Sequence, residues 1–473
     1  MNHPPLYHFH APEKKHFPFD PNGAFYCNGE YHLFYLFDDP SISRGKGDEC
    51  AWGHAVSHDL IHWRFCKPAL TACEGEKYIF SGSAFRTRDG GVGLCFYVVG
   101  KGISLAFPTD DTFEHWQRAD FNPIIPVNMP DDPRTKLYHV YDPHLWLGDD
   151  NIYYLLLGGR HRPDYKGDGA FLFASQDLKQ WDFRGQFYDV PDSVEPYEDM
   201  ACPDFFRLGG RDVLLGISHP HGARCYIGER QGDRFRIDVH QRLNHPGGTL
   251  FAPESLEDGR GRRIAWFWLL NDFFALPREL RMDPSGSRLL QFVPDEFQTL
   301  RAAPIQEFTG VLSAGEFQLL KSTGKTLCWE IKVRTGNGKL RLRLRSGRER
   351  DAEHLAAEID FDAKTLSSDT EKQRVPTNGP NILLEPPEGP KEMPERCSCH
   401  PRQTTVCEVQ EDGTFGLSLW LDYGVLELFS DDGAAVITQT FTEPEAPDAV
   451  HLALESTGGV TILQNQVFPI HPK

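Results

Sequence analysis

Short runs of apolar and aromatic residues, each bounded by turn residues, constrain this 473-residue chain more than any other feature. Residues 31–37, 92–99 and 152–157 are three examples, and each has the length of a typical β-strand. Glycine- and aspartate-rich turns separate the runs, and no long stretch repeats its apolar residues with the 3.6-residue period of a helix. Many short strands of this kind predict an all-β protein of the sandwich, barrel or propeller type.

A loose internal repeat favours the propeller. Residues 57–63 recur as residues 175–181, and both copies run from a serine through Asp-Leu to a tryptophan, with a weaker copy at 108–116. We interpret each copy as a tight polar turn of an outer hairpin, with its tryptophan packed between neighbouring sheets. Recurrence of this kind along the chain is what radial repetition of sheets predicts.

The pattern changes near residue 301. Beyond this point apolar residues alternate strictly with polar ones, as at 340–344 and 417–421, which is typical of a β-sandwich with one buried face. The stretch 365–402 is rich in Pro, Ser, Glu and Lys, and it is expected to be a long surface insertion or a partly disordered loop. We therefore predict a propeller domain over 1–301 and a sandwich domain over 302–473.

Composition excludes several classes of partner. The net charge of −19 argues against nucleic acid, which requires basic side chains, and against an anionic membrane surface. The first residues resemble no signal peptide, and no segment approaches the roughly 20 consecutive apolar residues of a membrane span. The eleven cysteines are scattered and odd in number, which is typical of reduced thiols. We expect a cytoplasmic protein that binds neither nucleic acid nor membrane.

A series of short motifs runs in order along nearly the whole chain. The series contains Asp20-Pro21-Asn22-Gly23, Trp52-Gly53-His54, Phe80-Ser81-Gly82-Ser83, Asp142-Pro143-His144, Cys202-Pro203-Asp204, Phe251-Ala252-Pro253-Glu254 and, in the C-terminal part, Leu419, Asp422, Glu427 and Phe429. In this order the motifs resemble glycoside hydrolase family 32, which includes invertases, inulinases and levanases. The resemblance implies an all-β fold, a five-bladed β-propeller followed by a C-terminal β-sandwich, with neither metal nor cofactor.

The chemistry implied by the resemblance is retaining hydrolysis of a glycosidic bond. One carboxylate acts as nucleophile, and a second carboxyl, roughly 5–5.5 Å away, acts first as acid and then as base. The resemblance assigns the nucleophile to Asp20 and the stabilisation of the transition state to Asp142, while Asn22 would bind a sugar hydroxyl. The cleft would be lined by Trp52, Phe80 and Ser81.

The expected acid is missing from its place. In family 32 this glutamate immediately precedes the Cys-Pro-Asp motif, where the present chain has Ala201. A methyl group cannot donate a proton, so either another carboxyl substitutes or the protein is not an ordinary hydrolase. The candidates are Glu198, Asp199 and Glu254, of which Glu198 is preferred. Whichever residue acts needs a pKa raised by burial or by a neighbouring carboxylate.

Other positions also depart from the family pattern. Phe19, Leu36 and Tyr141 stand where family members carry polar groups that hold fructosyl hydroxyls. These replacements favour a less polar or differently shaped ligand, or an aglycone that stacks on an aromatic ring such as Tyr141. The residues expected to bind substrate are therefore Asn22, Trp52, Phe80, Ser81, Tyr141, Asp199 and Glu254.

We predict a retaining glycoside hydrolase or transglycosylase that acts on a fructofuranoside or a fructose-containing oligosaccharide, with altered specificity. One alternative is a carbohydrate-binding or sensing protein on the same fold that has lost its proton donor. Another is an enzyme for a different furanoside, such as an arabinofuranoside. His219 and His221 suggest a metal pair, but a pair of turn histidines is the commoner arrangement. The expected partner is a small carbohydrate, and the sandwich offers edges through which a homodimer could form.

Overall fold

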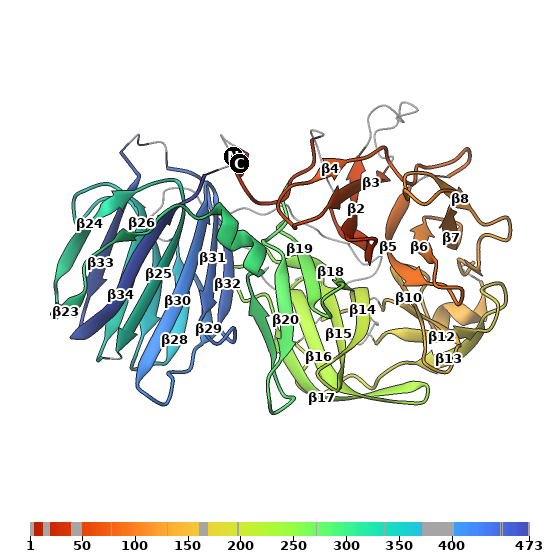
Figure 1. The fold of residues 1–473 in the computed structure, drawn as a ribbon. Helices are drawn as coiled ribbons and strands as arrows, with labels where there is room; N and C mark the ends of the chain where they lie inside the picture. Colours follow the sequence, from red (N-terminus) through yellow and green to blue (C-terminus); the bar gives the residue numbers. More distant parts are fainter. Residues whose placement is uncertain are drawn as a thin grey trace.

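The computed structural model folds into two β-rich lobes that lie side by side (Figure 1). It describes residues 4–12, 19–38, 50–76, 78–129, 131–159, 169–195, 198–270, 272–334, 336–370, 402–444, 446 and 448–471. The only helices in these ranges are two short 3-10 turns, η1 (Pro133–Lys136) and η2 (Asp295–Leu300). No helix in this part of the chain is long and apolar enough to cross a membrane. The predicted all-β class is confirmed.

Antiparallel sheets of four or five strands make up the first lobe. The sheets are β1 (Pro21–Cys27), β2 (Glu30–Asp38), β3 (Cys50–Ser57) and β4 (Arg64–Phe65); β5 (Ile79–Arg86), β6 (Val92–Val98), β7 (Gly102–Pro108), β8 (Trp116–Arg118) and β9 (Ile125–Pro126); β10 (Pro143–Leu147), β11 (Tyr153–Leu157), β12 (Phe171–Ser175) and β13 (Asp182–Gln186); β14 (Ala201–Leu208), β15 (Arg211–Ser218), β16 (Gly222–Gln231) and β17 (Arg234–Arg242); and β18 (Phe251–Glu257), β19 (Arg263–Trp268), β20 (Arg278–Met282) and β21 (Leu289–Phe292).

The first strands of these sheets form a closed ring. β1 contacts β5, β5 contacts β10, β10 contacts β14, β14 contacts β18, and β18 returns to β1. Within each sheet the strands then follow one another outward in chain order. This is the arrangement of a β-propeller, in which each sheet is a blade and its first strand faces the central axis.

The internal repeat seen in the sequence is a repeated turn at the outer hairpins. Asp59 and Asp177 each accept two backbone N–H bonds within their own turn. In each copy the tryptophan Nε1 donates to the carbonyl of the residue three before it, at 3.2 Å for Trp63 and 3.0 Å for Trp181. Trp63 also contacts Trp266 on the neighbouring blade, with ring centroids 6.3 Å apart. The interpretation of these residues as packing turns is confirmed.

The second lobe is a sandwich of two antiparallel sheets. One contains β22 (Ile305–Gln306), β34 (Val460–Pro469), β25 (Thr326–Arg334), β30 (Thr414–Asp422), β31 (Val425–Ser430) and β32 (Val436–Thr440), with β23 (Gly310–Leu312) paired to β34. The other contains β24 (Phe317–Thr323), β33 (His451–Ser456), β26 (Lys339–Ser346), β27 (Leu355–Asp360), β28 (Thr365–Asp369) and β29 (Arg402–Val406). Buried side chains such as Trp329, Leu342 and Leu419 fill the space between the sheets.

The predicted surface insertion in the second lobe begins later than expected. Residues 365–369 were expected to begin a surface insertion, but they form β28, which pairs along its full length with β29. The strand is held by pairing on both sides, with β27 and β29, and its three central residues are buried. Residues 371–401 of the predicted insertion lie outside the described residues. The predicted domain boundary at 301/302 falls between the end of β21 and the start of β22.

Buried charges join the N-terminal segment to both lobes. The Asp422 carboxylate at the end of β30 accepts hydrogen bonds from the backbone N–H groups of residues 6, 7 and 8. His8 bonds through Nδ1 to Asp422 at 2.8 Å and through Nε2 to Glu427 at 3.1 Å. Glu427 on β31 in turn accepts from Arg278 of the propeller at 3.1 Å. Burial alone would lower the pKa of His8, but its two carboxylate partners raise it to about 9.

Candidate active site

Polar side chains from separate blades meet at the starts of the inner strands. Ser81 on β5 donates a 2.6 Å hydrogen bond to Oδ2 of Asp20, the residue before β1. The Cys202 sulfur on β14 lies 3.9 Å from Asp20 Oδ2 and 3.7 Å from Oδ2 of Asp142, the residue that precedes β10. The structure therefore brings Asp20, Ser81 and Asp142 to one place, although their catalytic roles stay predictions.

Irregular backbone at the strand starts turns these side chains toward the axis. Asp142 and Cys202 have φ angles of 40° and 45°, and Ala252 at the start of β18 has 38°. The pairing of β14 with β15 also shifts register between Ala201 and Asp204, as in a β-bulge. A bulge redirects a side chain, and a left-handed residue other than glycine costs about 1–2 kcal/mol. Three such residues thus lie at the starts of inner strands, two of them at the carboxylate site.

Electrostatics keep Asp20 close to its titration point near neutral pH. Burial has the largest effect on its pKa and raises it, and the charge of Asp142 adds to the increase. The hydrogen bond from Ser81 and the charge of His219 act in the opposite direction, and the resulting pKa is about 6. Burial and the two carboxylates raise the pKa of Cys202 well above its ordinary value. The thiol therefore remains protonated and can donate its one proton to either carboxylate.

Two of the predicted substrate-binding side chains are buried and form hydrogen bonds with the backbone of the propeller. The Asn22 side chain is buried; it donates to the Asp20 carbonyl at 2.9 Å and accepts from the Gly82 N–H at 3.1 Å. These bonds fix the backbone of Asp20 and link the first blade to the second. Trp52 is fully buried in an apolar cluster, and its Nε1 donates to the Phe80 carbonyl at 3.1 Å. Phe80 keeps part of its surface exposed.

The residues that replace the family's polar groups are also buried. Phe19 stacks on Phe274 with ring centroids 4.6 Å apart, and Leu36 is packed in the cluster that contains Trp52. Tyr141 donates from its hydroxyl to the Met200 carbonyl at 3.2 Å. These contacts place the replacements in the packed core around the site.

Ala201 is fully buried in an apolar surrounding. It belongs to the same cluster of buried side chains as Tyr141, Ile217 and Phe251. Its backbone pairs with Ile217 on β15. The position that the resemblance assigns to the acid thus carries a methyl group packed among other apolar groups.

The contacts of Glu198 favour an ionised, structural carboxylate. Its partners are the Tyr226 hydroxyl, Arg224 Nε at 3.4 Å and His240 Nε2 at 3.0 Å. Burial raises the pKa of Glu198, but the hydrogen bond from His240, the charges of Arg224 and His240 and the bond from Tyr226 outweigh it and lower the pKa to about 2. A carboxyl of this kind holds no proton near neutral pH. These contacts therefore speak against the predicted role of Glu198 as the acid.

Glu254 has the raised pKa of an acid, but its carboxylate is bonded to the backbone of the first blade. Burial and the charge of Asp204 raise its pKa well above the ordinary value. Its Oε1 accepts a 2.7 Å hydrogen bond from the Ala24 N–H. This bond ties the Glu254 carboxylate to the backbone of the first blade.

Asp199 forms a pair that the sequence analysis did not anticipate. Its Oδ1 accepts from the His219 backbone N–H at 2.8 Å, and its Oδ2 lies 2.5 Å from His219 Nδ1. Asp199 is buried, whereas the His219 side chain is 16% exposed. The sequence suggested His219 only as half of a metal pair with His221. No group of three or more His, Cys, Asp or Glu residues suited to a metal occurs in the described part of the chain.

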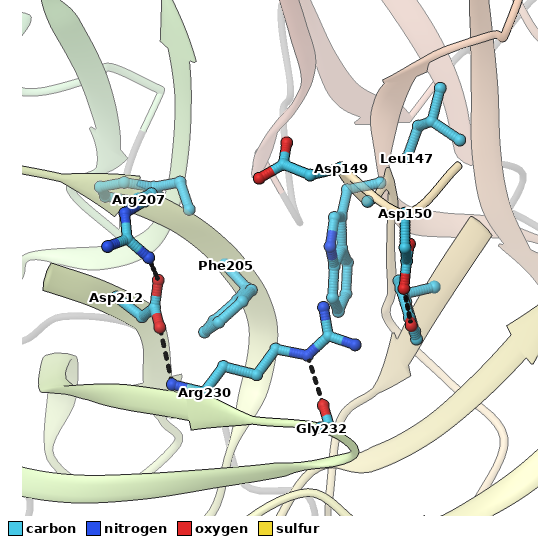
Figure 2. A pocket seen from close by; sticks show the side chains of 12 residues that line it. Leu147, Asp149, Asp150, Phe205, Arg207, Asp212, Arg230 and Gly232 are labelled. Carbon is cyan, nitrogen blue, oxygen red and sulfur yellow. Dashed lines mark hydrogen bonds and ion pairs between the residues drawn. The ribbon is translucent and has the colours of Figure 1, made fainter. Parts of the chain in front are cut away.

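A separate pocket of about 380 Å³ lies between the third and fourth blades. It is lined by the β10–β11 turn, the later part of β14 and the β16–β17 turn. Figure 2 shows Arg230 extending across it and donating to the Gly232 carbonyl, at 2.8 Å. The guanidinium lies 3.8 Å from the centroid of the Tyr154 ring. Because the pocket adjoins the end of β10 that is remote from Asp142, it is distinct from the carboxylate site.

Comparisons with known proteins identify the family. The model described as "Glycosyl hydrolases family 32 N-terminal domain" matches residues 8–291, and "Glycosyl hydrolases family 32 C terminal" matches residues 296–469. The chain belongs to glycoside hydrolase family 32.

The relatives in sequence are plant enzymes. A β-fructofuranosidase, insoluble isoenzyme, of Arabidopsis thaliana is 28% identical over 349 residues, which cover 63% of this chain and 61% of the relative. A fructan 1-exohydrolase of Hordeum vulgare is 28% identical over 363 residues, which cover 66% of this chain and 58% of the relative. The matched part thus spans about three fifths of the length of these curated relatives.

Solved structures share the fold over almost the whole chain. Fructan 1-exohydrolase IIa from Cichorium intybus superposes with a TM-score of 0.79 at 20% identity, covering 99% of this chain and 97% of the other. Sucrose-6-phosphate hydrolase from Lactobacillus gasseri gives a TM-score of 0.71 at 20% identity, with coverages of 99% and 93%. The predicted propeller followed by a sandwich is therefore confirmed.

Proposed function

We propose that the protein is a retaining glycosidase that cleaves a β-fructofuranoside, with Asp20 as nucleophile and Asp142 as the stabiliser of the transition state. The observation that carries the proposal is the placement of both carboxylates around the Cys202 sulfur, with Ser81 bonded to Asp20. Family membership and the names of the relatives support the substrate class.

In the proposed reaction an Asp20 oxygen attacks the anomeric carbon of the fructosyl group and forms a covalent ester. Asp142 lies beside it and can bind sugar hydroxyls while positive charge develops on the ring. With a pKa of about 6, Asp20 is largely ionised above that pH and able to attack. Its hydrogen bond from Ser81 orients the attacking group.

Solved complexes of structural neighbours guide the choice of ligand. One neighbour is a fructan 1-exohydrolase from Cichorium intybus in complex with 1-kestose, and another is a Bombyx mori β-fructofuranosidase variant in complex with sucrose. We propose a small fructose-containing carbohydrate as the ligand here. The cytoplasmic location also stays a proposal, supported by nine free cysteines in the described residues.

The test is turnover with a matched inactive variant. Wild-type protein and Asp20→Asn are incubated with sucrose, 1-kestose, inulin and an aryl arabinofuranoside, and the products are separated by chromatography. We expect fructose or fructosyl-transfer products with the wild type only, and a fructosyl ester on Asp20 by mass spectrometry. Binding without turnover across all four compounds would instead support the carbohydrate sensor suggested by Ala201. Cleavage of the arabinofuranoside alone would show that the substrate is an arabinofuranoside and not a fructofuranoside.

A further inference from the structure

The proposed reaction needs a proton donor for the leaving oxygen, and Ala201 cannot supply it. The donor must lie at the same face of the ring as Asp20 and Asp142. Of the carboxyls predicted from the sequence, Glu198 is held ionised by its contacts with Arg224, His240 and Tyr226, and Glu254 is bonded to the backbone of the first blade at Ala24. Other titratable groups near the start of β14 are therefore the remaining candidates.

The hairpin of the fourth blade places His219 at this face. β14 begins at Ala201 and β15 ends at Ser218, and the two strands pair antiparallel with Ala201 opposite Ile217. The turn that follows β15 therefore projects beside the start of β14, where Cys202 contacts both carboxylates. His219 is the first residue of that turn, and its charge acts on Asp20. It is bonded to Asp199, two residues before the position at which the resemblance places the family's glutamate.

Asp199 holds the histidine in a defined orientation. Because Asp199 accepts from both the backbone N–H and Nδ1 of His219, it fixes the turn and the ring together. A buried carboxylate bonded to Nδ1 favours the imidazolium and leaves proton exchange to Nε2. The pair is thus organised like other carboxylate–histidine pairs that transfer protons.

We propose, building on the proposed function, that His219 is the acid/base catalyst of this protein and that Asp199 is its positioning residue. In the first step Asp20 bonds to the anomeric carbon, the glycosidic C–O bond breaks, and Nε2–H of the imidazolium protonates the leaving oxygen. In the second step neutral Nε2 takes a proton from water, whose oxygen bonds to the anomeric carbon. The ester C–O bond then breaks and returns the Asp20 carboxylate and the His219 imidazolium.

The test compares leaving groups that need a proton with one that does not. The leaving sugar of sucrose is a poor leaving group, whereas p-nitrophenolate departs from p-nitrophenyl β-D-fructofuranoside without protonation. General acid catalysis contributes about 10²- to 10⁴-fold. We expect His219→Gln to lower kcat/KM for sucrose at least 100-fold. On the aryl substrate the rate of the first step, measured as the release of p-nitrophenolate in a single turnover, should change less than about tenfold. Asp199→Asn should show the same pattern with a smaller loss.

Matched controls separate this role from a structural one. His221→Gln changes the other histidine of the same turn and should leave both substrates unaffected, and thermal unfolding of each variant reports its folding. Sucrose turnover by His219→Gln within about threefold of wild type, or equal losses on both substrates, overturns the proposal. Absence of wild-type turnover on both substrates overturns the proposed function first and this inference with it. Selective loss on sucrose by Glu198→Gln would assign the acid to Glu198 instead.

Discussion

The hydrogen bond from Ser81 lowers the pH at which Asp20, the proposed nucleophile, ionises. The Ser81 hydroxyl donates to Asp20 Oδ2 at 2.6 Å, and this bond is stronger when the carboxyl is ionised. It opposes burial and the charge of Asp142, which together raise the pKa of Asp20. Replacing Ser81 with alanine removes the opposing interaction and should raise the pKa further.

The size of the effect follows from the strength of the bond. Hydrogen bonds to charged groups contribute about 1.5–3 kcal/mol, and one pKa unit corresponds to about 1.4 kcal/mol. Asp20 retains some exposed surface, so water can replace part of the lost bond. We therefore expect Ser81→Ala to move the acid limb of the activity profile upward by about one pH unit from its wild-type position near pH 6.

The assay is kcat/KM for an aryl β-fructofuranoside between about pH 4 and pH 9, because this quantity reports ionisations of the free enzyme. Ser83→Ala is the matched control: Ser83 lies two residues further along β5, and its hydroxyl accepts from the Leu145 N–H at 3.0 Å. Its acid limb should coincide with that of the wild type. An acid limb of Ser81→Ala that stays in place or moves to lower pH would refute the reasoning.

Three further predictions concern stability. Asp20 has a folded pKa raised from 3.8 to about 6, so its ionisation destabilises the fold as pH rises through this window. Asp20→Asn should therefore raise the free energy of unfolding at neutral pH by up to about 3 kcal/mol, and hardly at all near pH 4, measured by urea unfolding. Glu198 has a folded pKa lowered from 4.5 to about 2, so the ionised carboxylate stabilises the fold above pH 4.5 and this stabilisation is lost toward pH 2. Glu198→Gln should lower the free energy of unfolding in urea by about 2–3 kcal/mol at neutral pH and leave sucrose turnover intact. His8 has a folded pKa raised from 6.5 to about 9, so its contribution to the stability of the fold is complete below pH 6.5 and is lost as pH rises through 9. The Tm difference between wild type and His8→Gln should therefore become smaller between pH 6.5 and pH 9.

Local patterns account for what the sequence predicted well. The strands and the Asp-Leu-x-x-Trp turns depend on residues within about ten positions of one another, and the structure forms them as expected. The meeting of Asp20 with Asp142 followed from the family resemblance, since no local pattern links residues so far apart. Residues 365–369 were misjudged because their polar composition suggested a loop, whereas pairing with the distant strand β29 and with β27 makes them a strand.

The choice of acid could not be made from sequence. Glu198 attracted attention by its position before Ala201, yet its charge is compensated by Arg224 and Tyr226 on β16 and His240 on β17. Asp199 and His219 are twenty residues apart, and only the register of the β14–β15 hairpin brings them together. The sequence positions of Asp199 and His219 do not by themselves predict that register.

The change at Ala201 is coupled to its neighbours and is not an isolated loss. The Met200 sulfur lies so close to Gly216 that a Cβ there would sit 2.1 Å from it, and the Met200 carbonyl accepts from Tyr141. Tyr141 stands where the family has arginine, a cation that could pair with carboxylates at the site. With an alanine and a tyrosine in place of a glutamate and an arginine, one charge of each sign is absent and the space is filled by apolar packing. In the mechanism that we propose, the Asp199–His219 pair supplies one carboxylate and one cation in their place, and the turn after β15 carries the proton donor instead of β14.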